Sequence, residues 1–413
     1  MIAAPKLPTP VRILNALGRP LERVLPALSL DPDGLEREAR AATGLEDFGT
    51  DAYRAGLERL TADLERQGLL HSLGRRITRG RLVDALATRL RLQDWRKRHP
   101  EVAKQEIERP IVFMGMGRTG TTILHDLMAQ DPANRVPMTW EADAPCPPPE
   151  AESYDTDPRI AANEAQTAQV ERLIPGFRSM HPMGPLLPQE CVQLLAPTFV
   201  CMTYQITYHV PEYSRWLHEE ADLGAAYAYH RTFLQHLQSR KPGRWVLKSP
   251  CHLWHIEALL HEYPDAVCIQ THRDPLKITA SLASLGTTLQ AMCARPAPVK
   301  ELAEHWSHWN QVAYERGMRA RDEGRVGPDG ILDVGFQEFM GDPFETIRRI
   351  YGFAGLDFGA EVEERMRAFL AANPGDKHGK HRYRFADTGL DEATERARVR
   401  AYQERFRIPS EDL

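Results

Sequence analysis

The segment 111–123, Ile-Val-Phe-Met-Gly-Met-Gly-Arg-Thr-Gly-Thr-Thr-Ile, limits the possible folds of this chain more than any other stretch. Four apolar residues lead into a turn with three glycines, and apolar side chains at helical spacing come after it. A glycine-rich loop between a strand and a helix can surround an anion with backbone N–H groups, and the helix dipole adds to the attraction. The segment therefore predicts a strand, an anion-binding loop and a helix. A tight turn that binds nothing is the alternative interpretation.

The loop matches a known phosphate-binding pattern only in part. Gly115 and Gly120 have the spacing of the P-loop G-x-x-x-x-G-K-[ST], and Thr122 fills its last position. Thr121 replaces the lysine that would contact the β- and γ-phosphates, whereas Arg118 brings a cation inside the loop. Two alternative functions stay open on these residues: a nucleotide-dependent kinase or NTPase, and a non-catalytic nucleotide-binding module.

Short apolar runs alternate with helical patterns from residue 110 onward. This alternation predicts an α/β fold with a parallel sheet flanked by helices. Residues 1–105 have helical periodicity among many Arg and Glu side chains, so they are predicted to form a helical N-terminal extension to a domain over 106–413. The predicted strands are 111–114, 245–247, 267–271 and 331–334, and the predicted helices include 35–43, 53–68, 77–99, 253–261, 276–285 and 343–353.

Composition excludes several classes of protein. The net charge of −5 over 413 residues gives no global basic field for nucleic acid. The six cysteines are too sparse for a disulfide framework, and the N-terminus does not resemble a signal peptide, so a cytoplasmic location is expected. The stretch Cys191–Pro211 has no charged residue but is too polar to span a membrane, and it predicts buried segments that line a pocket. The sequence has no heptad pattern of a coiled coil, so it does not indicate an oligomeric state.

A second candidate anion site lies at the end of another predicted strand. Arg273 comes after the apolar run 267–271, and Ser281 stands eight residues later on the next predicted helix. The planar fork of an arginine matches phosphate geometry, and a serine hydroxyl adds a donor. His272 and Asp274, on either side of this arginine, also fit a kinase catalytic loop. Thr279, however, stands where that loop needs an asparagine to bind magnesium.

The two anion motifs together resemble those of sulfotransferases that use 3′-phosphoadenosine 5′-phosphosulfate (PAPS), over roughly residues 108–405. The resemblance implies a P-loop-like sheet and in-line, metal-independent transfer of a sulfuryl group to a hydroxyl or amine of a small-molecule acceptor, with PAP as the product. The residues implied to hold the 5′-phosphosulfate are Arg118, Thr119, Gly120, Thr121 and Thr122. Arg273 and Ser281 are implied to hold the 3′-phosphate, and the basic tract with Lys380, His381 and Tyr383 resembles the segment that closes over this phosphate in bacterial members.

The same resemblance suggests residues for the chemical step. Lys248 comes after the apolar run 245–247 and resembles the family lysine that contacts the sulfuryl group and the bridging oxygen, and Arg118 supplies a second cation. Glu141 resembles the glutamate base of tyrosylprotein-type members, and His252 is the second candidate for the base.

Four further residues are candidates for contact with the acceptor: His181, Glu190, Tyr204 and Tyr208. Their position in or beside the uncharged stretch favours an apolar small molecule that carries a hydroxyl. Helix capping, a salt bridge and ordinary core packing explain the same residues.

Overall fold

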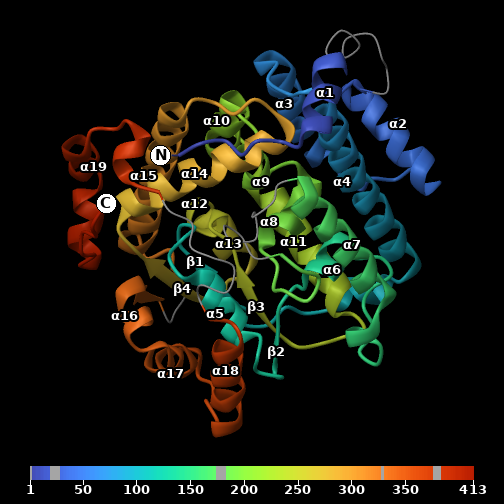
Figure 1. Cartoon of the computed structure of the whole chain (residues 1–413). Helices are drawn as coiled ribbons and strands as arrows, with labels where there is room; N and C mark the ends of the chain where they lie inside the picture. The colour runs from blue at the N-terminus through green and yellow to red at the C-terminus, as the bar shows by residue number, and fades with distance from the viewer. Residues whose placement is uncertain (1, 19–27, 174–182, 327–329, 375–382) are drawn as a thin grey trace.

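A parallel β-sheet forms the centre of the structure, a computed structural model that describes residues 2–18, 28–173, 183–326, 330–374 and 383–413. Within these residues the sheet has five strands in the order β2-β3-β1-β4-β5, and all neighbouring strands are parallel. The strands are β1 (Ile111–Met114), β2 (Asn134–Arg135), β3 (Arg244–Lys248), β4 (Val267–His272) and β5 (Ile331–Gly335). The central strand β1 leads into the glycine-rich turn, between β3 and β4 (Figure 1). The predicted α/β fold is confirmed.

Helices surround this sheet and extend beyond it at the upper right of Figure 1, where the helices of residues 9–98 lie. The α-helices are α1 (Thr9–Gly18), α2 (Pro32–Thr43), α3 (Ala52–Gln67), α4 (Ser72–Arg98), α5 (Thr121–Met128), α6 (Thr139–Asp143), α7 (Pro158–Leu173), α8 (Cys191–Leu195), α9 (Met202–Thr207), α10 (Pro211–Glu219), α11 (Leu223–Gln238), α12 (Cys251–Trp254), α13 (Ile256–Glu262), α14 (Pro275–Cys293), α15 (Val299–Asp322), α16 (Phe336–Gly341), α17 (Pro343–Ala354), α18 (Ala360–Ala372) and α19 (Glu392–Phe406). Short 3-10 helices lie at η3 (Pro100–Lys104), η4 (Tyr154–Thr156), η6 (Ala196–Thr198) and η7 (Phe385–Thr388).

The side chains of β1 alternate between two hydrophobic cores, one on each face of the sheet. Val112 and Met114 belong to the larger core, and Ile111 and Phe113 belong to the smaller one. Side chains of α5, α17 and α18 complete the smaller core, whereas the larger core reaches from α8 to α15 and on to the N-terminal helices. All four residues of β1 are buried, as expected for a parallel strand that is covered on both faces.

The N-terminal helices pack directly onto the sheet-bearing part of the chain. Leu57 of α3 and Leu86 of α4 are fully buried in the larger core. The buried carboxylate of Asp63 on α3 accepts hydrogen bonds from two backbone N–H groups, at positions 212 and 213, in the first turn of α10. The extension is therefore helical, as predicted, and it shares a core with the sheet-bearing part. Its separation from a domain over 106–413 stays a prediction.

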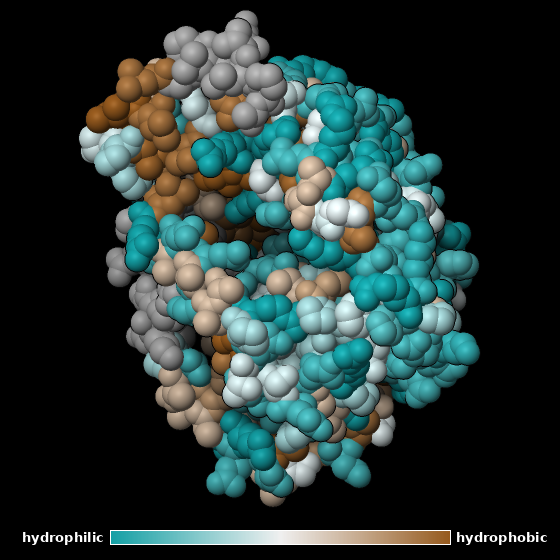
Figure 2. Space-filling model, turned by 90° about the vertical axis from the view of Figure 1, so that its right-hand side faces the viewer, coloured by the Kyte–Doolittle hydropathy of each residue, from teal (hydrophilic) through white to brown (hydrophobic). Residues whose placement is uncertain are grey.

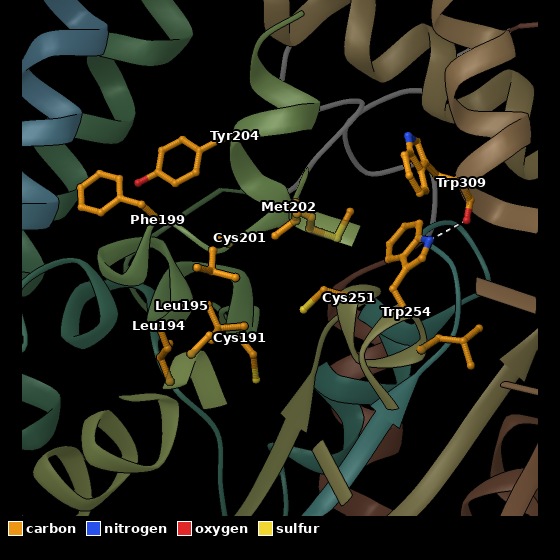
Figure 3. Packing of buried hydrophobic residues seen from close by; sticks show 14 of the residues in the cluster. Cys191, Leu194, Leu195, Phe199, Cys201, Met202, Tyr204, Cys251, Trp254 and Trp309 are labelled. Atoms are coloured by element: carbon orange, nitrogen blue, oxygen red, sulfur yellow. Dashed lines mark hydrogen bonds between the residues drawn. The ribbon is translucent and has the colours of Figure 1, made fainter. Parts of the chain in front are cut away.

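The uncharged stretch Cys191–Pro211 forms buried helical turns, as predicted, and its place beside a pocket stays a prediction. Its residues Cys191, Phe199 and Met202 belong to the larger core, and Figure 3 shows them across from Cys251 and the indole of Trp254. All six cysteines are free thiols. Among the described residues, no helix has both the length and the apolar character needed to cross a bilayer.

Several elements differ from the prediction. The helix predicted to end at residue 285 continues through the buried Gly286 to Cys293. α11 and α15 were not predicted, since their many His, Gln and Arg side chains hide the apolar period of a helix. Strand β2, with two residues, is too short to leave an apolar run in the sequence.

Candidate functional site

The carboxyl ends of β1, β3 and β4 bring the predicted site residues to one edge of the sheet. Because the strands are parallel, their carboxyl ends lie together, and ligands of open α/β sheets bind at this edge. The register pairs Phe113 of β1 with Lys248 of β3 and Met114 of β1 with Gln270 of β4. The glycine-rich loop therefore starts between Lys248 on one side and the β4–α14 turn with Arg273 on the other.

Three residues of the loop have backbone conformations that side chains rarely adopt. Gly115 has a φ of +135°, and a Cβ atom there would lie 2.5 Å from Oγ1 and 2.6 Å from the carbonyl oxygen of Thr271. Gly120 has a φ of +87° and begins α5. Arg118 has a φ of +75°, which costs energy in a residue other than glycine. Strain of this kind concentrates at functional sites, and the Arg118 side chain is exposed.

The loop threonines divide into two groups. The hydroxyl of Thr119 is buried and donates to the carbonyl oxygen of Met116 at 2.7 Å, and it lies 2.5 Å from Oγ1 of Thr271. This side chain closes the loop from inside, so only its backbone is left to bind an anion. Thr121 is buried at the start of α5, whereas Thr122 is exposed and accepts a hydrogen bond from Nζ of Lys248 at 3.4 Å.

Lys248 connects the loop with a carboxylate from a distant part of the chain. Its ammonium group forms an ion pair of 2.6 Å with Oε1 of Glu190, and only 4% of its side chain is exposed. The side chain of Glu190 is 22% exposed and stands just before α8. The structure thus brings together Lys248, Thr122 and Glu190, all of which the sequence analysis had selected.

Asp126 is a further candidate for a residue of the functional site, and the sequence analysis did not name it. It stands one turn of α5 after Thr122, and therefore lies on the same face of the helix. Burial raises the pKa of its carboxyl group to about 7, and the nearby charge of Lys248 opposes this rise. Spacing of four residues from a P-loop threonine was a signal that could have found it.

Arg273 lies at the end of β4 beside the glycine-rich loop. Its Nη1 donates to the carbonyl oxygen of Arg118 at 3.0 Å, and its guanidinium group stacks over the ring of Phe336 at 4.0 Å. Tyr383 is close enough to affect the pKa of this guanidinium group. Ser281 is buried on α14, and its neighbour Leu282 lies beside Gly117 of the loop. The two predicted anion sites therefore meet at one place.

Glu141 does not lie free at this edge. Its side chain is fully buried, and Oε2 accepts a hydrogen bond of 2.8 Å from Arg135. Oε1 accepts hydrogen bonds from the Met138 backbone N–H and the Tyr154 hydroxyl. Because both oxygens are engaged, this geometry gives Glu141 a structural role at the start of α6 and does not favour it as a base.

His252 is also enclosed by the protein. Its Nδ1 lies 2.8 Å from the hydroxyl oxygen of Tyr227, and its ring is fully buried. Burial and the nearby His230 hold its pKa well below the usual range of a histidine. His252 therefore stays neutral in the interior, as a core histidine does, and its predicted role as a base is not favoured either.

The two tyrosines proposed for acceptor contact are core residues. Tyr204 donates to the carbonyl oxygen of Ala196 and stacks on Phe199 with ring centroids 5.8 Å apart. Tyr208 is buried, and burial raises its pKa to about 12. Both belong to the larger core.

Three predicted residues, His181, Lys380 and His381, lie outside the described residues. In the part of the chain that the structure describes, no group of three His, Cys, Asp or Glu side chains is arranged to hold a metal ion.

The space-filling view shows a hollow with apolar side chains inside it, on the face that carries the N-terminal helices (Figure 2). Apolar side chains also gather above this hollow in the same view. Large aliphatic residues are exposed on α1, where Ile13, Leu14 and Leu17 are more than half exposed. An apolar recess of this kind suits an apolar ligand.

Known proteins resemble this chain over most of its length. The sequence model of a family described as the sulfotransferase family matches residues 110–360. The crystal structure of sulfotransferase STF9 from Mycobacterium avium superposes with a TM-score of 0.86 at 32% identity, over 92% of this chain and 98% of that one. Sulfotransferase STF1 from Mycobacterium tuberculosis H37Rv gives a TM-score of 0.79 at 32% identity, over 90% of this chain and 98% of that one.

A curated relative from Mycobacterium bovis is named omega-hydroxy-beta-dihydromenaquinone-9 sulfotransferase Stf3. It is 29% identical over 276 residues, which make up 63% of this chain and 66% of the relative. The match thus spans just under two thirds of the length of that relative.

Proposed function

Because this chain belongs to the sulfotransferase family, we propose that it transfers the sulfuryl group of PAPS to a hydroxyl group of an apolar small molecule. One observation carries the proposal: the ends of three parallel strands bring the glycine-rich loop, Lys248 and Arg273 to a single edge. Two cationic positions joined by an anion-binding loop suit a donor with anionic groups at both ends. A kinase or NTPase is not favoured by the family and its relatives.

The residues at this edge support PAPS as the donor. Arg118 and Thr122 are exposed on the loop, where a 5′-phosphosulfate group would meet backbone N–H groups at the start of α5. The guanidinium fork of Arg273 holds the two oxygens of a carboxylate, that of Glu411, at 2.8 Å each. The same fork suits the oxygens of a 3′-phosphate. PAPS would supply the sulfuryl group, and PAP would be the product.

Glu190 is the base that we propose for the acceptor. Its carboxylate is next to Lys248 and partly exposed, whereas the carboxylate of Glu141 and the ring of His252 are buried among other partners. The acceptor oxygen would bond to sulfur as its proton passes to Glu190, and the bond from sulfur to the 5′-phosphate oxygen would break. Lys248, 3.4 Å from Thr122, would neutralise charge on that leaving oxygen.

The acceptor that we propose is a hydroxylated molecule with a long apolar part. Two observations support this class: the apolar hollow of Figure 2 and the hydroxylated menaquinone in the name of the Mycobacterium bovis relative. Binding of a long apolar chain in a recess with apolar side chains is favourable, because the chain is removed from water.

Thermal unfolding with ligands tests the donor. PAP should raise the melting temperature more than MgATP does, because a ligand that binds only the folded state stabilises it and ATP has no 3′-phosphate for Arg273. Stronger stabilisation by MgATP would contradict the donor assignment. Turnover of labelled PAPS with long-chain alcohols, short phenols and amines then tests the acceptor, and we expect the long-chain alcohols to react fastest.

Replacement of Glu190 tests the base. Glu190→Gln should lower turnover at least tenfold and leave PAP affinity within about twofold, because a positioned base contributes roughly 10²–10⁴-fold to the rate. Glu152→Gln, at an exposed position, is the matched control and should have wild-type turnover. Unchanged turnover in the Glu190 variant would show that Glu190 is not the base, and Asp126 would then be the next candidate.

A further inference from the structure

The C-terminal tail returns to the predicted donor site. After α19 the chain runs back to the end of β4, where the carboxylate of Glu411 meets the guanidinium group of Arg273. Oε1 accepts from Nε and Oε2 accepts from Nη2, each at 2.8 Å. Only 15% of the Glu411 side chain and 18% of the Arg273 side chain are exposed, so this is a sheltered, two-pronged ion pair.

The backbone of the tail is held at the same point. The N–H group of Glu411 donates to Oδ2 of Asp274 at 2.7 Å. Asp274 in turn accepts two hydrogen bonds, of 2.6 and 2.8 Å, from Arg396 on α19. Asp274, itself held by the last helix, thus fixes the backbone of Glu411 beside Arg273.

This contact uses the edge of Arg273 that an anionic ligand would need. Nε and Nη2 bind Glu411, and Nη1 donates to the carbonyl oxygen of Arg118. The ring of Phe336 covers one face of the guanidinium group. A phosphate group that binds Arg273 through two oxygens therefore needs the same two N–H groups that already donate to Glu411.

We propose that Glu411 is a built-in competitor for the 3′-phosphate of the donor, an inference that rests on the proposed function. The tail must release Arg273 when PAPS binds, and it returns when PAP leaves. Glu411 weakens the affinity for both nucleotides, and it accelerates the release of PAP by taking over the guanidinium group as the phosphate departs. Affinity for an adenine nucleotide without a 3′-phosphate does not depend on Glu411.

Calorimetry with the full-length chain tests this inference. Glu411→Gln keeps the size of the side chain and its backbone hydrogen bond but removes the competing charge. We expect PAP to bind about three- to tenfold more tightly to this variant than to the wild type, the range for a partly exposed ion pair with good geometry. Adenosine 5′-phosphosulfate, which lacks the 3′-phosphate, should bind equally to both. Asp412→Asn, one residue further along the exposed tail, is the matched control and should bind both ligands as the wild type does.

The outcomes separate this inference from the proposed function. Unchanged PAP affinity in Glu411→Gln, with normal binding by the wild type, would overturn the competitor role alone. Weaker PAP binding in the variant would overturn it too, since Glu411 would then orient Arg273 for the phosphate. Tighter binding of both ligands would show that the effect does not involve the 3′-phosphate. If neither the wild type nor the variant binds PAP, the proposed function fails, and the inference fails with it.

Discussion

The edge of the sheet and the N-terminal helices are built on opposite principles. At the edge, the glycine-rich loop is strained at Arg118, and charged side chains such as Lys248 and Arg273 are held close to the loop. In the N-terminal helices, backbones touch directly: a Cβ atom at Gly74 of α4 would overlap the carbonyl group of Cys293 on α14. The first region contains strained backbone, as proposed ligand-binding sites often do, and the second provides stability through close packing. Substitutions at the edge should therefore affect binding, and substitutions in the packed interior should affect folding.

The largest expected effect is a loss of stability in acid, caused by histidines buried in the packed interior. Burial lowers the pKa of His230 and of His255 to about 3 and that of His236 to about 4. The unfolded chain takes up protons at these residues near pH 6.5, whereas the folded chain does not until the pH falls to these lower values. The free energy of unfolding should therefore fall from pH 7.5 to 5.5, by up to about 1.4 kcal/mol for each histidine and roughly 4 kcal/mol for these three. Other buried histidines whose pKa is lowered, such as His125 and His252, add to this fall.

Urea unfolding at several pH values measures this loss. His261→Asn, at an exposed position on α13, is the control and should keep the same acid dependence. A free energy of unfolding that is flat across this range would show that the three buried histidines do not control acid stability.

Gly74→Val tests the contact between α4 and α14. The new side chain would overlap the backbone of Cys293, and backbone cannot move aside as a flexible side chain does. We expect the free energy of unfolding to fall by about 3 kcal/mol or more, as in severely overpacked sites. Gly80→Ala on the same helix has open space around it, and it should stabilise the protein by about 0.5–1 kcal/mol. If both variants have wild-type stability, the N-terminal helices are not packed as described.

Arg273→Ala tests the edge of the sheet. Loss of a charge-assisted contact should weaken PAP binding by about 1.5–3 kcal/mol, or roughly 10- to 150-fold, with little effect on folding. Ser281→Ala should have the smaller effect, about tenfold at most, because a hydroxyl is a neutral donor. If calorimetry finds unchanged PAP affinity in a folded Arg273→Ala variant, Arg273 does not bind the 3′-phosphate.

Asp126→Asn should give the smallest change, and in the opposite direction. The raised pKa of Asp126 means that the folded state disfavours its carboxylate. The pKa of this group in the unfolded chain is about 4, so it reduces the stability of the fold as the pH rises above that value. Full linkage would give about 4 kcal/mol, but the Asp126 side chain is partly exposed and water reduces this cost. At pH 8 the amide should therefore raise the free energy of unfolding by about 1 kcal/mol, and the gain should vanish near pH 4. Lower stability in the variant at pH 8 would instead show that the carboxylate is stabilised in the fold.

Four of the five described strands and the two anion motifs were predictable because their signals are local. An apolar run that ends in glycines or in an arginine specifies a buried strand and the type of loop at its carboxyl end, as at Met114 and His272. Parallel pairing then brings strand ends to one edge without further information. The family, the α/β fold and the position of Lys248 beside the loop result from such patterns.

The partners of these residues were not predictable, because they come from distant parts of the chain. Glu190 precedes Lys248 by 58 residues, and Glu411 comes 138 residues after Arg273. Which carboxylate reaches which cation depends on how α8 and the tail after α19 pack, and no local pattern encodes that.

Burial explains the two candidates for the base that the geometry does not favour. Glu141 and His252 have the expected residue types at nearly the expected spacing, yet both face the protein interior. The chemistry of a side chain is set by its residue type, and this much is written in the chain. Its solvation and its neighbours, which set its pKa and its access to a substrate, arise only when the cores on the two faces of the sheet have packed.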